Sequence, residues 1–339
     1  MAEKKISMTL NLSENNLTKA QNFFDKYQLV SMLGDTEKKF HIGNKENKYC
    51  RFCRKSEPDV SFIKSAHVIP EFMGNHNLLS YFECDSCNSN FSKLEDSLSN
   101  FLGITRTISQ IKGKKKRIPK YKDPRTGLEM TIGDTGIQMT SIEGTDVFDL
   151  DTENKSLTIK TKRPGYIPIH IPKLLIKIGF SMLSEEELED YESTRRFIKD
   201  TEKEDQFKDF NLLRIFGYLI PGPPKFNKPF IQLYQKIDSD ITENIPKYQL
   251  LIYFANYQFQ MTLPFGKPDD HLQGEKVNLP IAPLLIDNSH LIEFGKEKFL
   301  NLNLTSHEKK SGEEHNITFQ FESYTDELIN KKNTDDKSE

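Results

Sequence analysis

Residues 50–53 read CRFC, residues 66–75 read AHVIPEFMGN and residues 84–88 read CDSCN, and the chain is organised around this stretch. It contains all four cysteines of the sequence as two Cys-x-x-Cys pairs, Cys50, Cys53, Cys84 and Cys87. Two such pairs can complete the tetrahedral four-sulfur shell that structural zinc prefers. The spacing therefore predicts a structural Zn²⁺ site held by these residues, rather than four unrelated buried cysteines.

The segment between the two pairs is predicted to form a β-hairpin, and the segment after them a helix. Residues 61–69, SFIKSAHVI, favour strand, and Pro70 and Gly74 interrupt the run that follows. After Cys87 the apolar residues recur with helical spacing up to Gly103, which is placed to end the helix. They are Phe91, Leu94, Leu98, Phe101 and Leu102.

In its motifs this stretch resembles the HNH endonucleases of the ββα-metal superfamily, over about a sixth of the chain. The resemblance implies that His67 is the general base that takes a proton from the attacking water. It implies that Asn75, or as the less favoured choice Asn77, braces the loop. It also implies that Asn88 is a ligand of a catalytic Mg²⁺ or Mn²⁺, because an amide oxygen suits these ions.

One position departs from the pattern of that family. Many members have an acidic metal ligand directly before the first histidine, and here that residue is Ala66. Glu95 lies two helical turns from Asn88, about 10–11 Å along the axis, so we interpret it and Asp96 as solvated or arginine-paired charges. A site completed by waters and substrate phosphate remains open, as do three other acidic ligands, Glu71, Glu83 and Asp85.

These residue types suit hydrolysis of phosphodiesters. Imidazole can activate a water near neutral pH, and a Mg²⁺-like ion stabilises the charge that develops at the scissile phosphate. A four-cysteine zinc has no open coordination position, so it is not the catalytic ion. The sequence predicts a metal-dependent endonuclease acting on DNA, with double-stranded DNA favoured. The alternative is a zinc-dependent nucleic-acid-binding protein without cleavage activity.

Positive charge is concentrated directly after the predicted helix. Residues 104–125 contain nine Lys or Arg and one acidic residue, a net charge of +8, whereas the whole chain is −3 and the remainder therefore −11. Such a cluster favours contact with a phosphate backbone without sequence preference. The predicted nucleic-acid contacts are Arg106, Lys112, Lys114, Lys115, Lys116, Arg117 and Lys120.

The remaining sequence predicts an α+β protein of 339 residues in more than one domain. We expect an N-terminal helical segment at 1–35, with an amphipathic helix from Glu14 to Met32, and an HNH nuclease domain with its basic extension at 36–127. An α+β domain with a mostly antiparallel sheet follows at 128–329, and a disordered tail at 330–339. Because no 18-residue apolar run or signal peptide occurs, we expect a cytoplasmic protein that does not enter a membrane.

Residues 128–329 contain a predicted helix at 172–183 and a second helix through Lys199, which Ser184 and Glu187 begin as a capping box. Strand-like runs follow. This order resembles the C-terminal regions of bacterial HNH proteins, some of which are anti-phage defence effectors with a sensing domain at this place. The resemblance implies a defence effector gated by an activating ligand or partner protein. A role of this region in substrate binding or in oligomerisation, including formation of a homodimer, remains open.

Overall fold

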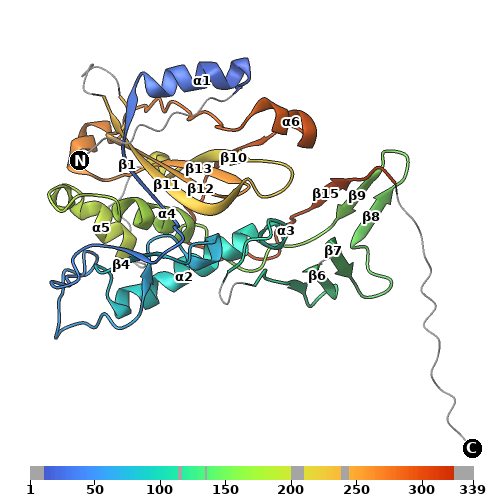
Figure 1. The fold of residues 1–339 in the computed structure, drawn as a ribbon, viewed down its shortest axis with the longest axis horizontal. Helices are drawn as coiled ribbons and strands as arrows, with labels where there is room; N and C mark the ends of the chain where they lie inside the picture. Colours follow the sequence, from blue (N-terminus) through green and yellow to red (C-terminus); the bar gives the residue numbers. More distant parts are fainter. Residues whose placement is uncertain (1–10, 114–116, 134–135, 200–209, 238–243, 324–339) are drawn as a thin grey trace, which may run out of the picture.

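The structure is a computed structural model that describes residues 11–113, 117–133, 136–199, 210–237 and 244–323. The predicted tail at 330–339 and the predicted contacts Lys114, Lys115 and Lys116 lie outside these residues. The chain forms an α+β fold with mostly antiparallel sheets, as predicted (Figure 1). None of the described helices is long and apolar enough to cross a membrane.

A six-stranded antiparallel sheet is the largest element of the fold. Its strand order is β1 (Tyr27–Gly34), β11 (Phe226–Lys236), β12 (Tyr248–Ala255), β13 (Tyr257–Thr262), β10 (Ile215–Leu219) and β14 (Lys298–Leu302). Both central strands, β12 and β13, are buried at every position. Helix α1 (Glu14–Phe24) covers one face of the sheet, and helices α4 (His170–Phe180) and α5 (Glu192–Lys199) cover the other (Figure 1).

Helix α4 joins this sheet to the cysteine-containing region. All eleven of its residues are buried. On one side Gly179 lies so close to Leu250 of β12 that an added Cβ would come within 3.0 Å of that side chain. On the other side α4 packs against α2 (Asp85–Leu102), whose residues Phe91 and Leu98 belong to the same hydrophobic core. A continuous core therefore crosses the predicted domain boundary at residue 127.

The N-terminal helix is shorter than predicted. The sequence pattern suggested a helix to Met32, but α1 ends at Phe24 and β1 begins at Tyr27. Strand β1 pairs with β11 from Tyr27 opposite Lys236 to Gly34 opposite Phe230, with a register shift between Leu29 and Ser31. Pairing with a distant strand overrides the local helical periodicity here, so the predicted second half of this helix was wrong.

Two small sheets form an extension that projects from the main body (Figure 1). One contains β5 (Tyr121–Asp123), β6 (Leu128–Gly133) and β7 (Gly136–Thr140), and the other contains β8 (Phe148–Asp151), β9 (Ser156–Ile159) and β15 (Ile317–Gln320). They share a separate small core that includes Tyr121, Met130 and Ile159. Two further short helices are α3 (Thr105–Ile108), which precedes this extension, and α6 (Asn288–Phe294), which lies beside the main sheet.

The predicted capping box before α5 forms only in part. The Glu187 carboxylate accepts hydrogen bonds from the backbone N–H of Ser184 at 3.1 Å and from its hydroxyl at 2.9 Å. A 3₁₀ turn (Glu187–Glu189) follows, and α5 begins only at Glu192. The predicted helix is therefore divided near Tyr191, whose side chain is fully buried.

Candidate functional site

A three-stranded sheet and helix α2 carry the predicted site residues. Strand β4 (Leu78–Ser80) lies between β2 (Phe40–Ile42), which is parallel to it, and β3 (Ala66–His67), which is antiparallel. Strands β3 and β4 form the predicted hairpin, with a 3₁₀ turn (Glu71–Met73) in its loop. Helix α2 begins at Asp85 and ends at Leu102 before Gly103, as the apolar spacing predicted.

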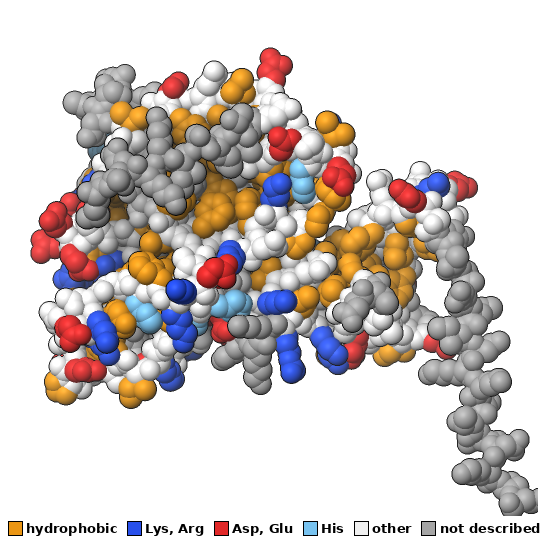
Figure 2. All heavy atoms as spheres, viewed as in Figure 1, with side chains coloured by type: hydrophobic (Ala, Val, Ile, Leu, Met, Phe, Trp, Pro, Cys, Tyr) orange, Lys and Arg blue, Asp and Glu red, His pale blue; other side chains and the backbone are white. Residues whose placement is uncertain are grey.

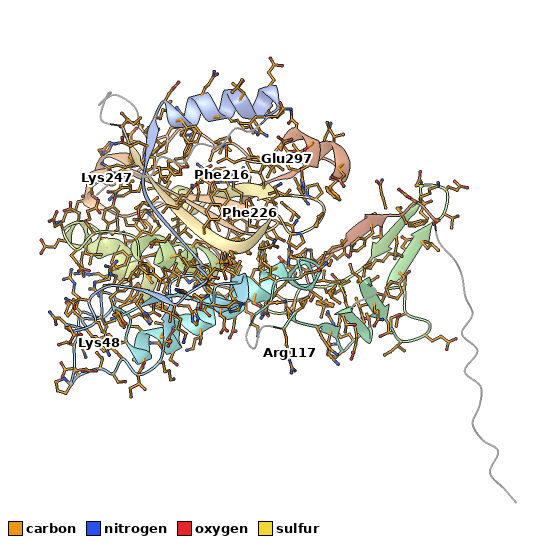
Figure 3. The ribbon with its side chains drawn as sticks, viewed as in Figure 1. Lys48, Arg117, Phe216, Phe226, Lys247 and Glu297 are labelled. Carbon is orange, nitrogen blue, oxygen red and sulfur yellow. The ribbon has the colours of Figure 1, made fainter. Side chains whose placement is uncertain are left out.

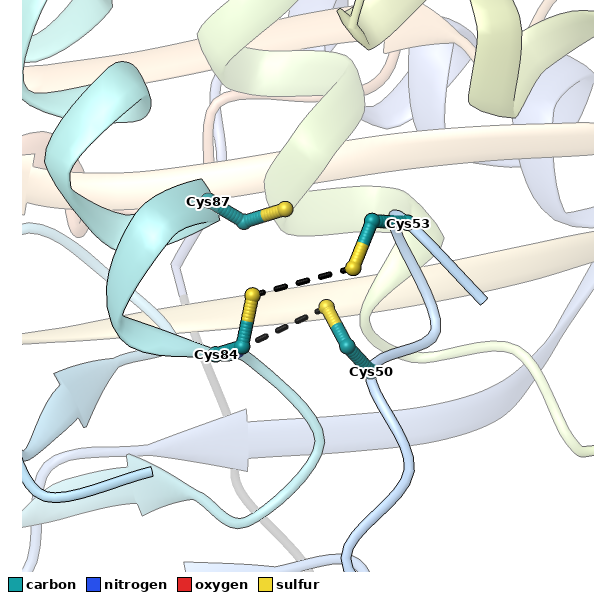
Figure 4. Close-up of side chains that lie close together, drawn as sticks. All are labelled: Cys50, Cys53, Cys84 and Cys87. Atoms are coloured by element: carbon teal, nitrogen blue, oxygen red, sulfur yellow. Dashed lines mark hydrogen bonds between the residues drawn. The ribbon is translucent and has the colours of Figure 1, made fainter. Parts of the chain in front are cut away.

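The four cysteines come together between the loop at residue 50 and the start of α2 (Figure 4). All four sulfur atoms lie within 4.8 Å of one another, and the Sγ atoms of Cys53 and Cys84 are 3.7 Å apart. Tetrahedral zinc with Zn–S bonds of about 2.3 Å requires sulfur–sulfur separations of about 3.8 Å. The donor set and its spacing therefore fit one tetrahedral metal ion.

The thiols of this cluster influence one another strongly. The pKa of Cys50 is lowered to about 5, chiefly by the hydrogen bond from Cys87, and the pKa of Cys87 is raised, chiefly by the same bond. Burial raises the pKa of Cys84 to about 11. Several thiolates so close together repel each other, and a bound dication removes that repulsion. The arrangement is typical of a structural metal site.

His67 lies on β3, opposite Leu79 of β4, and is half-buried. Its pKa is lowered, first because burial disfavours the charged ring. Lys177 and His76 lower this pKa further, whereas Glu71 and Asp35 oppose the shift. His67 is therefore held as the neutral imidazole at neutral pH, which is the form that can accept a proton.

The buried side chain of Asn75 hydrogen-bonds to several backbone groups of the hairpin loop. Its side chain is fully buried and donates hydrogen bonds to the carbonyl oxygens of Ile69 at 2.6 Å and Leu78 at 2.9 Å. Its amide oxygen accepts from the backbone N–H of Leu78 at 2.9 Å and of Asn77 at 3.3 Å. The side chain of Asn77 instead donates to the carbonyl of Thr36 at 2.7 Å. By geometry, Asn75 is the residue that braces the loop.

Asn88 lies in the first turn of α2, where its backbone N–H donates to the Cys84 carbonyl at 2.9 Å. Its side chain makes no hydrogen bond with the described residues. The amide oxygen is therefore free to serve as a ligand of a hard cation such as Mg²⁺. Apart from the cysteines, the described residues contain no group of three convergent His, Cys, Asp or Glu side chains, so such an ion would need waters and substrate phosphate to complete its shell.

The structure narrows the choice of acidic ligands. Asp85 caps the loop before it, because its carboxylate accepts hydrogen bonds from Ser61 and from the backbone N–H groups of Ile63 and Lys64. Glu83 is buried in an ion pair and does not face solvent. Of the three acidic residues that the sequence leaves open as ligands, Glu71 remains.

Glu95 is half-buried rather than solvated, and burial raises its pKa to about 6. Its charge also interacts with those of Glu71 and Glu83, which further raise this pKa. Ala66, at the place where many members of the ββα-metal superfamily have an acid, is completely buried.

Residues 50–102 match the family model described as HNH endonuclease. The matched region includes both Cys-x-x-Cys pairs, the β3–β4 hairpin and helix α2, which is the region whose geometry is described above. No curated protein and no solved structure matches the chain. The match identifies residues 50–102 as an HNH endonuclease region with a possible metal site at its cysteines.

Lys177 of α4 reaches into the HNH region and was not predicted to do so. Its ammonium group donates to the carbonyl oxygen of His67 at 3.1 Å and lies 2.8 Å from Oε2 of Glu83. Both side chains of the Lys177–Glu83 pair are only 1% exposed. The available signal was the presence of Lys173 and Lys177 inside the otherwise apolar run KLLIKIGF, since a lysine is rarely buried unless it is paired.

Replacing Lys177 with Met should destabilise the whole protein, because Glu83 would keep a buried carboxylate without its partner. Removing one member of a buried ion pair costs about 3–5 kcal/mol of unfolding free energy. Urea unfolding of Lys177→Met and of the double variant Lys177→Met/Glu83→Gln measures this, and the double variant should recover part of the loss. Lys93→Met, at an exposed position on α2, is the matched control. A Lys177→Met protein as stable as this control would contradict a stabilising role of the buried Lys177–Glu83 pair.

Arg51, inside the first cysteine pair, makes a second connection to α4. Its guanidinium donates to the carbonyl oxygens of Phe180, Ser181 and Leu183 at 3.0–3.2 Å, at the C-terminal end of that helix. A cation at this end satisfies carbonyl groups that lack helical partners. The HNH region is therefore fixed to the rest of the chain from both its first cysteine loop and its His67 strand.

The predicted nucleic-acid contacts differ in exposure. Lys112, Arg117 and Lys120 are exposed, whereas Arg106 is half-buried and donates to Ser99 at 2.6 Å. Figure 2 shows Lys and Arg side chains along the side of the molecule that carries the HNH region and the start of the extension. Figure 3 places Arg117 on that same side.

Proposed function

We propose that this chain is a metal-dependent endonuclease that hydrolyses phosphodiester bonds of DNA. The observation that carries this proposal is the HNH match at residues 50–102, together with a His67 held neutral on the β3 strand of that region. The basic, exposed residues that follow α2 support a polyanionic substrate. Double-stranded DNA is the substrate we favour.

In the proposed mechanism His67 accepts the proton of the attacking water. Asn75 fixes the loop that follows His67, and the hydrogen bond from Lys177 fixes the backbone carbonyl of His67 itself. Asn88 offers an amide oxygen to a divalent ion. When bound, a Mg²⁺ or Mn²⁺ ion stabilises negative charge on the scissile phosphate and the leaving oxygen. The four cysteines hold a structural Zn²⁺, which keeps the start of α2 against the first cysteine loop.

The test is nicking of supercoiled plasmid by the zinc-loaded full-length chain. Mild chelation should stop nicking without removing the structural zinc, and Mg²⁺, Mn²⁺ or Ni²⁺ should restore it. The second candidate function, a zinc-dependent DNA-binding protein, draws its support from the buried Ala66 at the usual position of an acidic ligand. DNA binding without nicking in any of these metals would favour this second function.

The pH dependence of cleavage should report the pKa of His67. A general base acts in its unprotonated form, so a lowered pKa keeps the enzyme active to lower pH. We expect kcat/KM to fall on acidification with a midpoint below about 6.5, the ordinary value for histidine. Glu71→Gln should move this midpoint lower still, because Glu71 raises the pKa of His67. A midpoint that moves upward in this variant would contradict the role of His67.

A defence role with gating by the C-terminal region is a further part of the proposal. It draws on the resemblance to bacterial HNH effectors and on the contacts of α4 with His67 and with the first cysteine loop, since a shift of α4 would move the general base. A gated defence nuclease should be tolerated on bacterial expression and should reduce phage plaques. His67→Ala should be tolerated but should not protect. Toxicity of the wild-type chain without phage would contradict gating.

A further inference from the structure

A cleft of about 350 Å³ lies beside the HNH hairpin loop and is not used by the mechanism above. Three separate parts of the chain line it. The hairpin loop contributes Gly74 and His76, and the start of the basic segment contributes residues 109–112. Asn227 and Lys228 come from β11 of the main sheet, and Asp35 directly follows β1. The cleft therefore joins the HNH region to a sheet whose contribution to function is otherwise undefined.

The cleft lies next to the candidate general base. His76 and Asp35 are on its wall, and the charges of both act on the pKa of His67. His76 Nδ1 is also 3.8 Å from the Glu71 carboxylate, whose charge raises the pKa of His67. A group bound in this cleft would lie beside the reacting phosphodiester rather than at a remote surface.

The walls of the cleft are fixed to one another by backbone contacts. The Asp35 carboxylate accepts hydrogen bonds from the backbone N–H groups of His76 at 3.0 Å and Asn77 at 2.7 Å. The backbone N–H of Asp35 donates to the carbonyl of Pro229 at 3.0 Å. Gly74, with a φ of +99°, lies against Ile111 and Pro229. The site is thus formed before any ligand binds, which reduces the entropy cost of binding.

The chemistry of the lining favours a phosphate group. Lys112 and Lys228 supply positive charge, and both side chains are exposed at the cleft. Lys112 forms no ion pair with the described residues. Lys228 pairs with Glu37, an exposed side chain, and an exposed pair of this kind is weak enough to be exchanged for a phosphate. Among the described residues that line the cleft, Asp35 is the one with a carboxylate, and its Oδ1 accepts both backbone N–H groups.

We propose that this cleft binds the phosphate of a nucleotide that flanks the scissile phosphodiester, with Lys112 and Lys228 as its cationic contacts. The inference rests on the proposed nuclease function and assigns part of the substrate site to the main sheet. A volume of about 350 Å³ accommodates a small portion of one strand, not a duplex. The rest of the substrate would extend along the exposed basic segment.

Salt-dependent DNA binding tests this proposal in the full-length chain, with Lys112→Gln, Lys228→Gln and Glu37→Gln as variants. Each lysine variant should weaken binding about five- to tenfold at 0.1 M salt and flatten the slope of log K against log salt by about 0.9. Glu37→Gln should instead tighten binding, because it frees Lys228. If the Lys228–Glu37 pair served only to stabilise the fold, Lys228→Gln and Glu37→Gln would both weaken DNA binding. That result would overturn the proposal.

Lys296→Gln is the matched control, since it removes one exposed positive charge elsewhere. Its neighbour Glu297 lies near α6, across the main sheet from Arg117 (Figure 3). This variant should leave the salt slope unchanged. If the wild-type chain binds and cuts DNA while both lysine variants keep its slope, the cleft assignment alone is wrong. If the wild-type chain does not bind DNA, the proposed function itself fails.

Discussion

Cys84→Ser should unfold the HNH region and release its zinc. Cys84 is completely buried, and its sulfur lies 3.7 Å from that of Cys53 in a cluster that fits a tetrahedral ion. Structural zinc contributes about 10–16 kcal/mol of apparent binding free energy in small zinc domains, which is comparable to the whole stability of a typical protein, about 5–15 kcal/mol. Because α2 belongs to the main hydrophobic core, loss of the site should also loosen α4 and the sheet.

Elemental analysis and thermal unfolding measure this effect. The wild-type chain should contain about one zinc per molecule, and Cys84→Ser should contain almost none and melt at a much lower temperature. Ser86→Ala, at an exposed position in the same helical turn, is the matched control and should retain both zinc and stability. A Cys84→Ser protein with its full zinc content and melting temperature would show that the cysteines do not form the structural site.

His67→Ala should abolish DNA cleavage while the fold and the zinc remain. A positioned general base contributes about 10²–10⁴-fold to the rate, and the described structure places no other histidine on the β3–β4 strand pair. His67 is half-buried and does not contact the cysteine cluster through any described hydrogen bond, so its removal should cost little stability.

Single-turnover nicking rates, zinc content and melting temperature together test this expectation. His271→Ala, which removes an exposed histidine from a 3₁₀ turn in the other half of the chain, should behave as the wild type does. DNA binding by His67→Ala should also be unchanged, since the basic residues remain. Cleavage by His67→Ala at the wild-type rate would exclude His67 as the base.

The features that could be predicted from the sequence are those coded by local patterns. The spacing of the two Cys-x-x-Cys pairs predicts that their four sulfur atoms converge. The apolar spacing from Phe91 to Leu102 predicts one face of α2 up to Gly103. The β-hairpin that carries His67 follows from the strand-favouring residues and the Pro70 and Gly74 breaks. Each of these features depends on residues close together in the sequence.

The features that could not be predicted depend on contacts between distant segments. The end of α1 at Phe24 is determined by pairing of β1 with β11, about 200 residues later. The hydrogen bond from Lys177 to the His67 carbonyl spans 110 residues. The cleft lined by His76 and Lys228 likewise depends on segments that lie far apart in the sequence. Local periodicity carries no information about such pairings.

Truncation of the C-terminal region would remove some of these distant contacts. A fragment ending near Arg125 would lack α4, whose eleven buried residues pack against α2 and supply Lys177. Loss of activity in such a fragment would report unfolding rather than regulation. Point variants in the whole chain, such as those at Lys177 and Lys228, separate these effects.

Metal-dependent cleavage of DNA by the HNH region can be separated from DNA binding in a single reaction. Zinc-loaded full-length protein in excess is incubated with an end-labelled DNA duplex in Mn²⁺ or Mg²⁺, and strand scission and complex formation are followed in the same samples. We predict scission in the presence of either ion and none after chelation. A stable protein–DNA complex whose strands remain intact in every metal would contradict endonuclease activity.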